Sequence, residues 1–291
     1  MASCLVTTSA LAMLRASVTS SNHTPGGAER PVAAATEAPR LSMRGITKRF
    51  GTVDALRGAD LTVMPGEIMA LVGDNGAGKS TLVKCLAGVG LADQGEIRIE
   101  GDLVAIGGPQ DAVAAGVETV YQDLALCDNL DVVANLYLGR ELRSPERGPF
   151  ARFLAVRRMS AEAQRILTEL SVTLPSLSTK VASLSGGQRQ AIAVGRAVLW
   201  GSRIVVMDEP TAALGVQQTA MVYRLIRSLK ERGISVILIS HNMVDVFEVA
   251  DRVTVMRLGR TAGVFDTAQD SPSDVIAAIT GAAELKEGPA S

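Results

Sequence analysis

Cysteine and histidine are both scarce in this sequence of 291 residues. The three cysteines, Cys4, Cys85 and Cys127, are far apart and form no CxxC pair, so the sequence indicates neither a disulfide framework nor a zinc knuckle. The two histidines, His23 and His241, leave little material for a transition-metal site. A reducing cytoplasm is the compartment that fits best.

Long apolar runs and an excess of one charge are also absent. Hydrophobic residues make up 47% of the chain, but no uninterrupted run approaches the roughly 18 residues that would span a bilayer, so we expect a chain that does not cross a membrane. Lys plus Arg number 29 against 30 Asp plus Glu, which gives a net charge of -1 and no basic footprint for nucleic acid. The charge of an anionic ligand must therefore be met locally, by a few residues.

Residues 1–40 differ in composition from the rest of the chain. They are rich in Ala, Ser, Thr and Pro, which indicates a disordered leader. A secretory signal is not indicated, because no positive residue precedes the weakly apolar run Leu5–Leu14. A start of translation close to Met43 is an alternative interpretation. We expect one domain over residues 41–265, with a helical subdomain at about 122–194, and then a C-terminal helix and tail over 266–291.

From Leu41 onward, strand and helix patterns alternate, which predicts an α/β fold. Apolar runs such as Ile204–Met207 are typical of parallel strands buried on both faces. Between residues 122 and 194 helical patterns take over, interrupted by a loop at residues 145–149. The predicted strands are Ala59–Val63, Glu67–Val72, Glu96–Glu100, Ile204–Met207, Ser235–Ile239 and a hairpin of Val253–Met256 with Thr261–Phe265. The predicted helices are Lys79–Ala87, Asp131–Leu138, Ser160–Leu170, one beginning at Ser185, Val216–Arg232 and Asn242–Ala250.

The stretch from Gly73 to Ser80 reads GDNGAGKS, which is the GxxxxGKS phosphate-loop pattern. It follows a predicted strand and opens a predicted helix, as this motif requires. Backbone N–H groups of such a loop wrap the phosphates, Lys79 reaches the terminal phosphates and the Ser80 hydroxyl holds Mg²⁺. A simple glycine turn gives no reason for Lys79 and Ser80 to stand together. The predicted ATP-binding residues are Gly73, Asp74, Asn75, Gly76, Ala77, Gly78, Lys79, Ser80 and Thr81, the last of which can donate to the α-phosphate.

An acidic pair, Asp208 and Glu209, follows the apolar strand Ile204–Met207. A carboxylate at the end of a buried strand needs a partner to offset its desolvation, and Mg²⁺ is such a partner. In P-loop enzymes an acidic residue of this kind holds the metal that bridges the β- and γ-phosphates, alongside the loop hydroxyl. The sequence therefore predicts Ser80 and Asp208 as Mg²⁺ ligands. An alternative for Glu209 is a structural role in capping the turn before Pro210.

The four residues Ser185-Gly186-Gly187-Gln188 have the SxxQ spacing of a capping box, which predicts a helix that begins at Ser185. Two glycines directly after the cap are poor helix formers, and they indicate that the backbone approaches something closely. A γ-phosphate at this helix N-terminus satisfies both features. One chain cannot easily present two helix ends to one phosphate from opposite sides, but two chains can. We expect Arg189 and Arg196 on this helix to lie on a solvated face or in subunit contacts.

Leu184 to Gln188 reads LSGGQ, and together with the phosphate loop and the Asp208-Glu209 pair it resembles the ATP-binding subunits of ABC transporters, over about residues 41–259. The resemblance implies an α/β P-loop NTPase fold with a RecA-like core, an antiparallel β subdomain and an α-helical subdomain. It also implies a head-to-tail homodimer. In that dimer the LSGGQ residues Ser185, Gly186, Gly187 and Gln188 of one subunit complete the ATP site of the other.

The same resemblance implies roles for single residues. Glu209 is the general base that deprotonates the attacking water, and His241, at a strand end, points at the γ-phosphate. Gln122 contacts Mg²⁺ or the attacking water and relays contact with a membrane partner. Phe50 stands where the family places an aromatic ring against adenine. Gly215 departs from the family, which usually has Asp there; this weakens the expectation that the two ATP sites communicate, but leaves the metal ligands and the base unaltered.

Three further stretches, Met207–Glu209, Pro210–Gly215 and Ser240–Met243, resemble the ATPases of bacterial importers of ribose, xylose or fructose. Those proteins often carry two ATPase halves, whereas this chain has one half with all its motifs. The resemblance implies a peripheral subunit on the cytoplasmic face of the inner membrane. A homodimer would work beneath two integral-membrane permease subunits, with a periplasmic sugar-binding protein delivering the sugar. No nucleic-acid partner is expected.

Three alternatives stay open from the sequence. An ABC ATPase that acts on ribosomes or DNA favours tandem halves, basic arms or a long coiled coil, and none is visible. An ATPase that serves another cargo or an exporter permease has no feature here that separates it from a sugar importer. A subunit without catalysis is expected to lack Lys79, Glu209 or His241, and all three are present.

Overall fold

The computed structural model of the protein describes residues 38–144 and 153–282. Several sequence predictions lie outside these residues: the leader up to residue 37 with Cys4 and His23, the loop at Pro145, Gly148 and Pro149, and the tail from residue 283. Of the two cysteines described, Cys85 is buried and Cys127 is half-buried, and both are free thiols. Burial raises the pKa of the Cys85 thiol to about 11.

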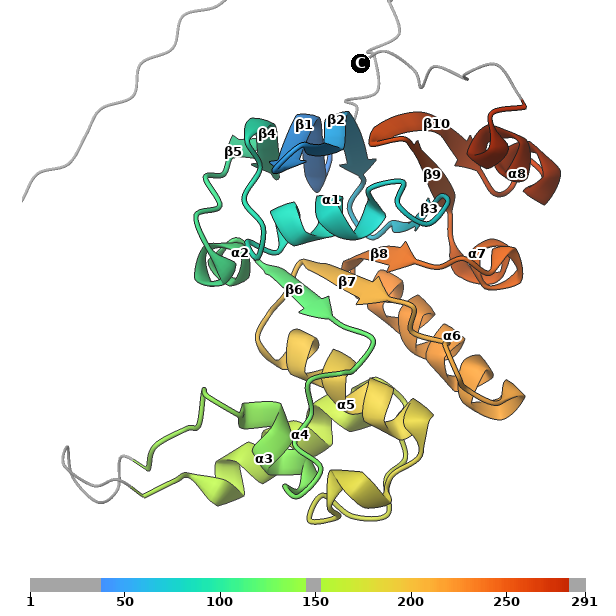
Figure 1. The fold of residues 1–291 in the computed structure, drawn as a ribbon. Coiled ribbons are helices and arrows are strands. Elements are labelled where there is room, and N and C mark those ends of the chain that lie inside the picture. Colours follow the sequence, from blue (N-terminus) through green and yellow to red (C-terminus); the bar gives the residue numbers. More distant parts are fainter. Residues whose placement is uncertain (1–37, 145–152, 283–291) are drawn as a thin grey trace, which may run out of the picture. The chain divides into compact units, whose positions relative to one another are not determined.

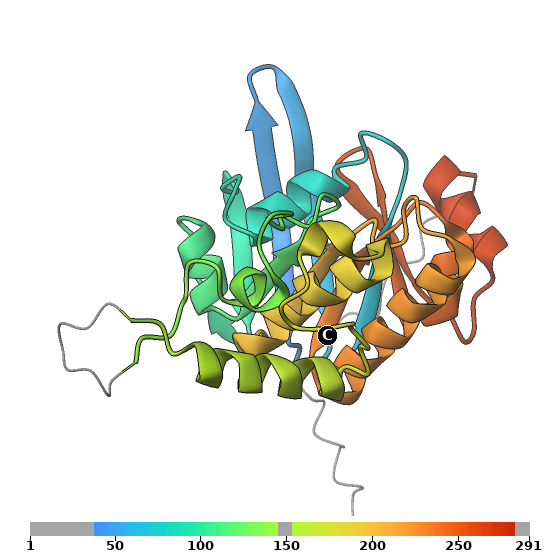
Figure 2. The same cartoon turned by 90° about the horizontal axis from the view of Figure 1, so that it is seen from below.

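A small antiparallel sheet is formed by the first part of the domain. Its strand order is β2-β1-β4-β5, and β1 pairs with both β2 and β4. A turn at Gly51 and Thr52 joins β1 to β2, which makes a long hairpin that extends away from the helices in Figure 2. The strands are β1 (Leu41–Phe50), β2 (Val53–Val63), β4 (Gln94–Ile99) and β5 (Asp102–Leu103).

A six-stranded sheet forms the centre of the domain. Its order is β10-β9-β3-β8-β7-β6; the neighbours from β9 to β6 are parallel, and β10 pairs antiparallel with β9. Each residue of β3 and β8 is buried, as expected for strands covered on both faces. The strands are β3 (Ile68–Val72), β6 (Val117–Val120), β7 (Ile204–Asp208), β8 (Ser235–Ile239), β9 (Arg252–Arg257) and β10 (Arg260–Asp266).

The helices follow the predicted order, and the 3-10 helix Val181–Ser183 is one that was not predicted. The helix predicted from Ser160 begins four residues earlier, at Val156, and the short helix Pro109–Ala114 was not predicted. Among the described residues, no helix is both long enough and apolar enough to cross a membrane. The helices are α1 (Lys79–Leu86), α2 (Pro109–Ala114), α3 (Val132–Tyr137), α4 (Val156–Glu169), the 3-10 helix η2 (Val181–Ser183), α5 (Gly186–Leu199), α6 (Val216–Glu231), α7 (Met243–Val249) and α8 (Pro272–Thr280).

The six-stranded sheet separates two hydrophobic cores, because successive side chains of a strand point to opposite faces. On β3, Met69 and Leu71 pack with α1 and the four-stranded sheet. The alternate residues Ile68, Ala70 and Val72 pack with helices α3 to α8. Figure 1 shows α1 between the two sheets and α5 and α6 on the other side of the six-stranded sheet. Helices α1 and α5 therefore lie on opposite faces of one sheet.

Candidate functional site

Four parallel strands end at the same edge of the six-stranded sheet. Leu71 of β3 pairs with Ile239 of β8, which also pairs with Asp208 of β7. Met207 of β7 pairs with Val120 of β6. In open α/β sheets, ligands bind in the crevice outside the carboxyl ends of the strands. The predicted residues at this edge are Gly73 to Thr81 after β3, Gln122 after β6, Asp208 and Glu209 at the end of β7, and His241 after β8.

The phosphate loop joins β3 directly to α1. Gly73, Gly76 and Gly78 all have positive φ values, and Gly78 is the N-cap of α1. The N–H groups of the first turn of α1 have no partner further back in the helix, so they are free to bind an anion. The Lys79 ammonium donates hydrogen bonds to the carbonyl oxygens of Gly73 (2.7 Å) and Asp74 (3.0 Å). The loop therefore already holds the lysine amine among its own backbone atoms.

Gly73 leaves no room for a side chain. A Cβ added there would lie 2.2 Å from the backbone oxygen of Met256, and the φ of Gly73 is +146°. We expect Gly73→Ala to lower the free energy of unfolding by at least about 2 kcal/mol, measured by urea denaturation without nucleotide. Gly215→Ala is the matched control, because Gly215 has a φ of -74° and no neighbour within 4 Å of an added Cβ. Equal denaturation midpoints for the two variants would contradict the claim that Gly73 has no room for a side chain.

Opposite charges lie close together at the strand ends. Burial lowers the pKa of Lys79, while the negative charges of Glu209, Asp74 and Asp208 oppose that shift. Burial raises the pKa of Asp208, and the carboxylate of Glu209 raises it further. None of the hydrogen bonds or ion pairs between described residues involves the Asp208 carboxylate. A half-buried carboxylate of this kind suits a bound cation.

The donor set at the strand ends fits Mg²⁺. Ser80 is exposed in the first turn of α1, and Asp208 is half-buried at the end of β7. A hydroxyl and a carboxylate are hard oxygen donors, and Mg²⁺ is bound in nucleotide sites by one or two such groups together with phosphate oxygens. Ser80 and Asp208 are the side chains that would hold it.

Glu209 and His241 form a direct pair. The Glu209 carboxylate lies 2.8 Å from Nδ1 of His241, and the side chains are 19% and 77% exposed respectively. Glu209 has a φ of +48°, so the chain turns sharply as soon as β7 ends. The Glu209 N–H donates to the carbonyl oxygen of Ile239 (3.0 Å), which ties this turn to the end of β8. A carboxylate held in this way can accept a proton from a water molecule at the strand ends.

The last two predicted residues, Gln122 and Phe50, have exposed side chains. Gln122 is exposed in the loop after β6, where Leu124 and Ala125 adopt positive φ values. Phe50 ends β1 in the hairpin of the four-stranded sheet; its side chain is 54% exposed, and the Lys48 ammonium lies 5.6 Å from the ring centroid. An exposed ring beside a cation is available to stack on another planar group.

The predicted capping box is confirmed. The Ser185 hydroxyl accepts a hydrogen bond from the backbone N–H of Gln188 (3.3 Å), and the Gln188 side-chain oxygen accepts one from the N–H of Ser185 (3.1 Å). The Gln188 amide also donates to the carbonyl oxygen of Thr173 (3.1 Å). Because α5 packs on the face of the sheet opposite α1, this capped end and the phosphate loop do not meet within one chain.

The two glycines after the cap have a packing reason within the chain. A Cβ on Gly186 would lie 2.6 Å from Cδ2 of Leu214, and one on Gly187 would lie 3.3 Å from the sulfur of Met221. The two glycines therefore allow the backbone to pack closely against the loop before α6 and against α6 itself. This internal contact accounts for the glycines without an anion.

Arg189 and Arg196, which were expected on a solvated face or in subunit contacts, are half-buried and also have partners inside the chain. Arg189 forms an ion pair with Asp128 (2.6 Å). Arg196 donates to the carbonyl oxygen of Ala125 at 3.5 Å. Both partners belong to the loop that follows Gln122, so α5 is linked to that loop.

Comparison with known proteins decides the family. A family model described as ABC transporter matches residues 56–212, which is more than half of the chain. The chain belongs to the ABC transporter family. Its relatives in this family are ATPases coupled to transport, and the chain is accordingly an ATP-binding, ATP-hydrolysing ABC subunit.

Curated relatives of this ABC subunit cover most of its length. The chain is 48% identical over 248 residues to the fructose import ATP-binding protein FrcA of Rhizobium meliloti, covering 84% of this chain and 95% of that protein. It is 43% identical over 220 residues to the xylose/arabinose import ATP-binding protein XylG of Sulfolobus acidocaldarius, covering 76% and 85%. It is 44% identical over 225 residues to the ribose import ATP-binding protein RbsA 2 of Escherichia coli O157:H7, but spans only 43% of that longer protein.

Solved structures confirm the predicted fold class. The ATP-binding cassette MJ1267 in its ADP conformation superposes with a TM-score of 0.70 at 26% identity, covering 83% of this chain and 95% of that one. A nucleotide-free ATP-binding cassette from an ABC transporter superposes with a TM-score of 0.68 at 26% identity, covering 78% and 91%. This ABC subunit therefore has the α/β P-loop NTPase fold, with an antiparallel β-sheet and a group of helices beside the central sheet.

Sequence reasoning missed two buried polar residues of this ABC subunit. Asn135 is 1% exposed, and its side chain bonds the backbone N–H (2.8 Å) and carbonyl oxygen (3.0 Å) of Cys127, which fixes the loop after Gln122. Asp245 is 6% exposed and joins the segments that carry Glu209 and His241. A polar residue on the buried face of a predicted helix is the signal that could have found both.

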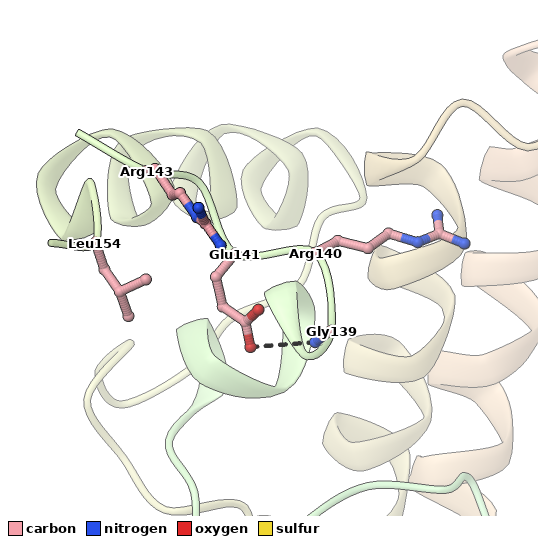
Figure 3. Close-up of a pocket in the computed structure, with 5 residues that line it drawn as sticks. All are labelled: Gly139, Arg140, Glu141, Arg143 and Leu154. Atoms are coloured by element: carbon pink, nitrogen blue, oxygen red, sulfur yellow. Dashed lines mark hydrogen bonds between the residues drawn. The ribbon is translucent and has the colours of Figure 1, made fainter. Parts of the chain in front are cut away.

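A hollow in the helical part of the ABC subunit is separate from the strand-end cluster. It is lined by Gly139, Arg140, Glu141, Arg143 and Leu154. Figure 3 shows the Glu141 carboxylate accepting a hydrogen bond from the N–H of Gly139 (3.1 Å), while Arg140 points away. The Arg140 guanidinium instead lies 5.0 Å from the ring centroid of Trp200. None of the residues predicted to bind ATP lines this hollow.

Proposed function

We propose that two copies of this chain enclose ATP and Mg²⁺ between them, head to tail, and hydrolyse ATP to drive uptake of a monosaccharide through a separate permease. The observation that carries the shared site is the placement of two helix ends. The N-terminus of α1 and the capped N-terminus of α5 lie on opposite faces of the six-stranded sheet. An ATP on the phosphate loop can therefore receive the Ser185–Gln188 end only from a second copy.

The proposed roles follow from the positions of the side chains. Residues 73–81 wrap the phosphates, and Lys79 exchanges its carbonyl partners for phosphate oxygens. Ser80 and Asp208 would hold Mg²⁺, and Gln122 follows β6, the strand that pairs with β7. Bound Mg²⁺ would neutralise charge on the phosphates. Phe50 stacks on adenine, since its ring is exposed at the tip of the β1–β2 hairpin.

Hydrolysis needs a base beside the terminal phosphate. Glu209 accepts a proton from the attacking water, because its carboxylate sits at the end of β7 next to the phosphate loop. The hydrogen bond from His241 fixes the direction in which that carboxylate points. His241 is exposed, so it can also reach a phosphate on the loop. Positioning and electrostatics carry most of the catalysis of phosphoryl transfer.

The proposed cargo rests on the relatives. Proteins 42–48% identical to this chain are named as import ATP-binding proteins for fructose, xylose or arabinose, and ribose. We place the homodimer on the cytoplasmic face of the inner membrane, beneath two integral-membrane permease subunits that receive the sugar from a periplasmic binding protein. The ATPase contacts the permease and not the sugar, so its residues do not encode which sugar is carried.

Uptake by cells tests the proposed cargo. Cells lacking this chain are compared with cells carrying the unaltered chain or Lys79→Ala, using radiolabelled fructose, ribose and xylose. We expect the unaltered chain, but not Lys79→Ala, to restore uptake of one of these sugars, because transport requires ATP at the phosphate loop. If the uptake of each of these three sugars were the same in every strain, the sugar assignment would be ruled out. The assignment of the chain as an ATPase would not be affected.

A further inference from the structure

A buried carboxylate lies behind the Glu209–His241 pair. Asp245 on α7 is 6% exposed and accepts hydrogen bonds from three side chains on three different segments. The Tyr223 hydroxyl donates to Oδ1 at 2.5 Å, and the Asn242 amide donates to Oδ1 at 2.9 Å. The Thr211 hydroxyl donates to Oδ2. A carboxylate removed from water needs such donors, and bonds to a charged acceptor are about twice as strong as neutral ones.

The donors connect Asp245 to both members of the pair. Thr211 stands two residues after Glu209, and the intervening Pro210 is buried. Asn242 directly follows His241. The Asn242 side-chain oxygen accepts from the N–H of Val244 (3.0 Å), so its amide nitrogen is turned toward Asp245. Asp245 thus holds the loop after β7 and the loop after β8 at a fixed separation.

We propose that Asp245 is a positioning residue for ATP hydrolysis: it keeps the Glu209 carboxylate and the His241 ring aligned beside the phosphate loop. The inference rests on the proposed role of Glu209 as the base. Asp245 touches neither ATP nor water in this role. A misplacement of about 1 Å at a reacting group can cost about a hundredfold in rate, which gives such a distant carboxylate leverage over turnover.

The proposal predicts that a substitution at Asp245 lowers the rate of turnover but leaves the affinity for ATP unchanged. None of the Asp245 hydrogen bonds within the described residues goes to the phosphate loop. ATP affinity depends on residues 73–81 and is expected to stay unchanged, whereas turnover depends on the alignment of Glu209. If Asp245 only joined α6 to α7, there would be no reason to expect a loss of turnover without a loss of ATP affinity.

A second link between α6 and α7 provides a matched control for a purely structural role of Asp245. Arg227 on α6 donates to the carbonyl oxygen of Glu248 (2.7 Å) and to its carboxylate (2.5 Å), so it also ties α6 to α7. Arg227 and Glu248 are exposed, and within the described residues neither side chain bonds Glu209, His241 or Asp245. Arg227→Gln removes a link between the same two helices without touching the Asp245 bonds.

The experiment compares Asp245→Asn, Arg227→Gln and Glu209→Gln in the ATPase assay and by titration calorimetry. Asparagine has nearly the shape of aspartate but keeps one acceptor oxygen and no charge, so it cannot serve all three donors. We expect Asp245→Asn to lower kcat by about tenfold or more with an ATP Kd within about twofold of the unaltered chain, and Arg227→Gln to change neither. Unchanged kcat in Asp245→Asn, or an equal loss in Arg227→Gln, would overturn the proposal.

Two further measurements keep the test independent of folding and of the proposed base. Thr211→Val and Tyr223→Phe each remove one donor, and the Thr211→Val effect on kcat should not add to that of Asp245→Asn. Hydrogen exchange of the Glu209 and Ala212 amides should speed up in Asp245→Asn and not in Arg227→Gln, because both amides lie in the turn that Thr211 anchors. Slow exchange in Asp245→Asn contradicts the proposal. Full activity in Glu209→Gln would instead overturn the role of the base itself.

Discussion

Glu209→Gln is expected to bind ATP with nearly unaltered affinity and to lose turnover by at least about a hundredfold, since a general base of this kind contributes about 10² to 10⁴. The amide preserves the shape of the side chain and can keep a hydrogen bond to His241, but it cannot accept the proton of water. Steady-state phosphate release and titration calorimetry measure the two quantities separately.

Glu96→Gln serves as the charge-matched control. Glu96 lies on β4 of the four-stranded sheet, where it forms an exposed ion pair with Arg98 (3.0 Å). We expect this variant to keep both ATP affinity and turnover, because exposed pairs contribute little. Unchanged turnover in Glu209→Gln would remove this residue from the role of base. Loss of ATP binding in the same variant would point to a structural role in the turn before Pro210.

Lys79→Ala is expected to weaken ATP binding by about a hundredfold, which corresponds to about 2.7 kcal/mol. The Lys79 ammonium sits among the loop carbonyls of Gly73 and Asp74, so its charge is already in place for phosphate oxygens. Its removal also leaves Asp208 and Glu209 without the positive charge that the lysine supplies. The lost affinity is measured by titration calorimetry with ATP and Mg²⁺.

Lys84→Ala is the matched control for the lysine. Lys84 is an exposed residue in the last turn of the same helix, α1, so its truncation changes net charge equally without altering the loop. We expect an ATP Kd within about twofold of the unaltered chain, because Lys84 is exposed and its charge has the smallest of the effects on the pKa of Asp208. Equal losses in the two variants would mean that overall charge, and not Lys79 in its loop, governs ATP affinity.

The sequence is sufficient to predict the order of the site elements. The apolar run of β7 predicts a buried strand with Asp208 and Glu209 at its end. The sheet register places them beside β8, which precedes His241, and β3, which precedes Gly73, is the next strand along. This succeeds because the apolar period and the turn residues are local properties of the chain. The short elements β5, β6, α2 and η2 were not predicted, because so few residues show no clear periodicity. The longer strand β1 was also missed, because register shifts along it break the alternation of buried and exposed residues.

Contacts made across the fold are not visible in the sequence. The Asn242-x-x-Asp245 spacing reads as a helix cap, whereas the Asp245 carboxylate actually binds Thr211 and Tyr223 from distant segments. Likewise the glycine after Ser185 has its reason in the side chain of Leu214, which arrives from a later loop. Such partners depend on how helices pack on the sheet, and a pattern along one segment does not contain that information.

The molar mass of Glu209→Gln in solution tests the shared ATP site most directly. Size-exclusion chromatography with light scattering is run with and without ATP and Mg²⁺, for Glu209→Gln and for Glu209→Gln combined with Ser185→Arg. The chain has a mass of 30.4 kDa, and the account predicts twice that mass for Glu209→Gln with ATP and a single-chain mass without it. Adding Ser185→Arg should restore the single-chain mass, because the capped end of α5 can no longer close on the partner's nucleotide. A single-chain mass for ATP-bound Glu209→Gln at every concentration, with its permease present or absent, would contradict the account.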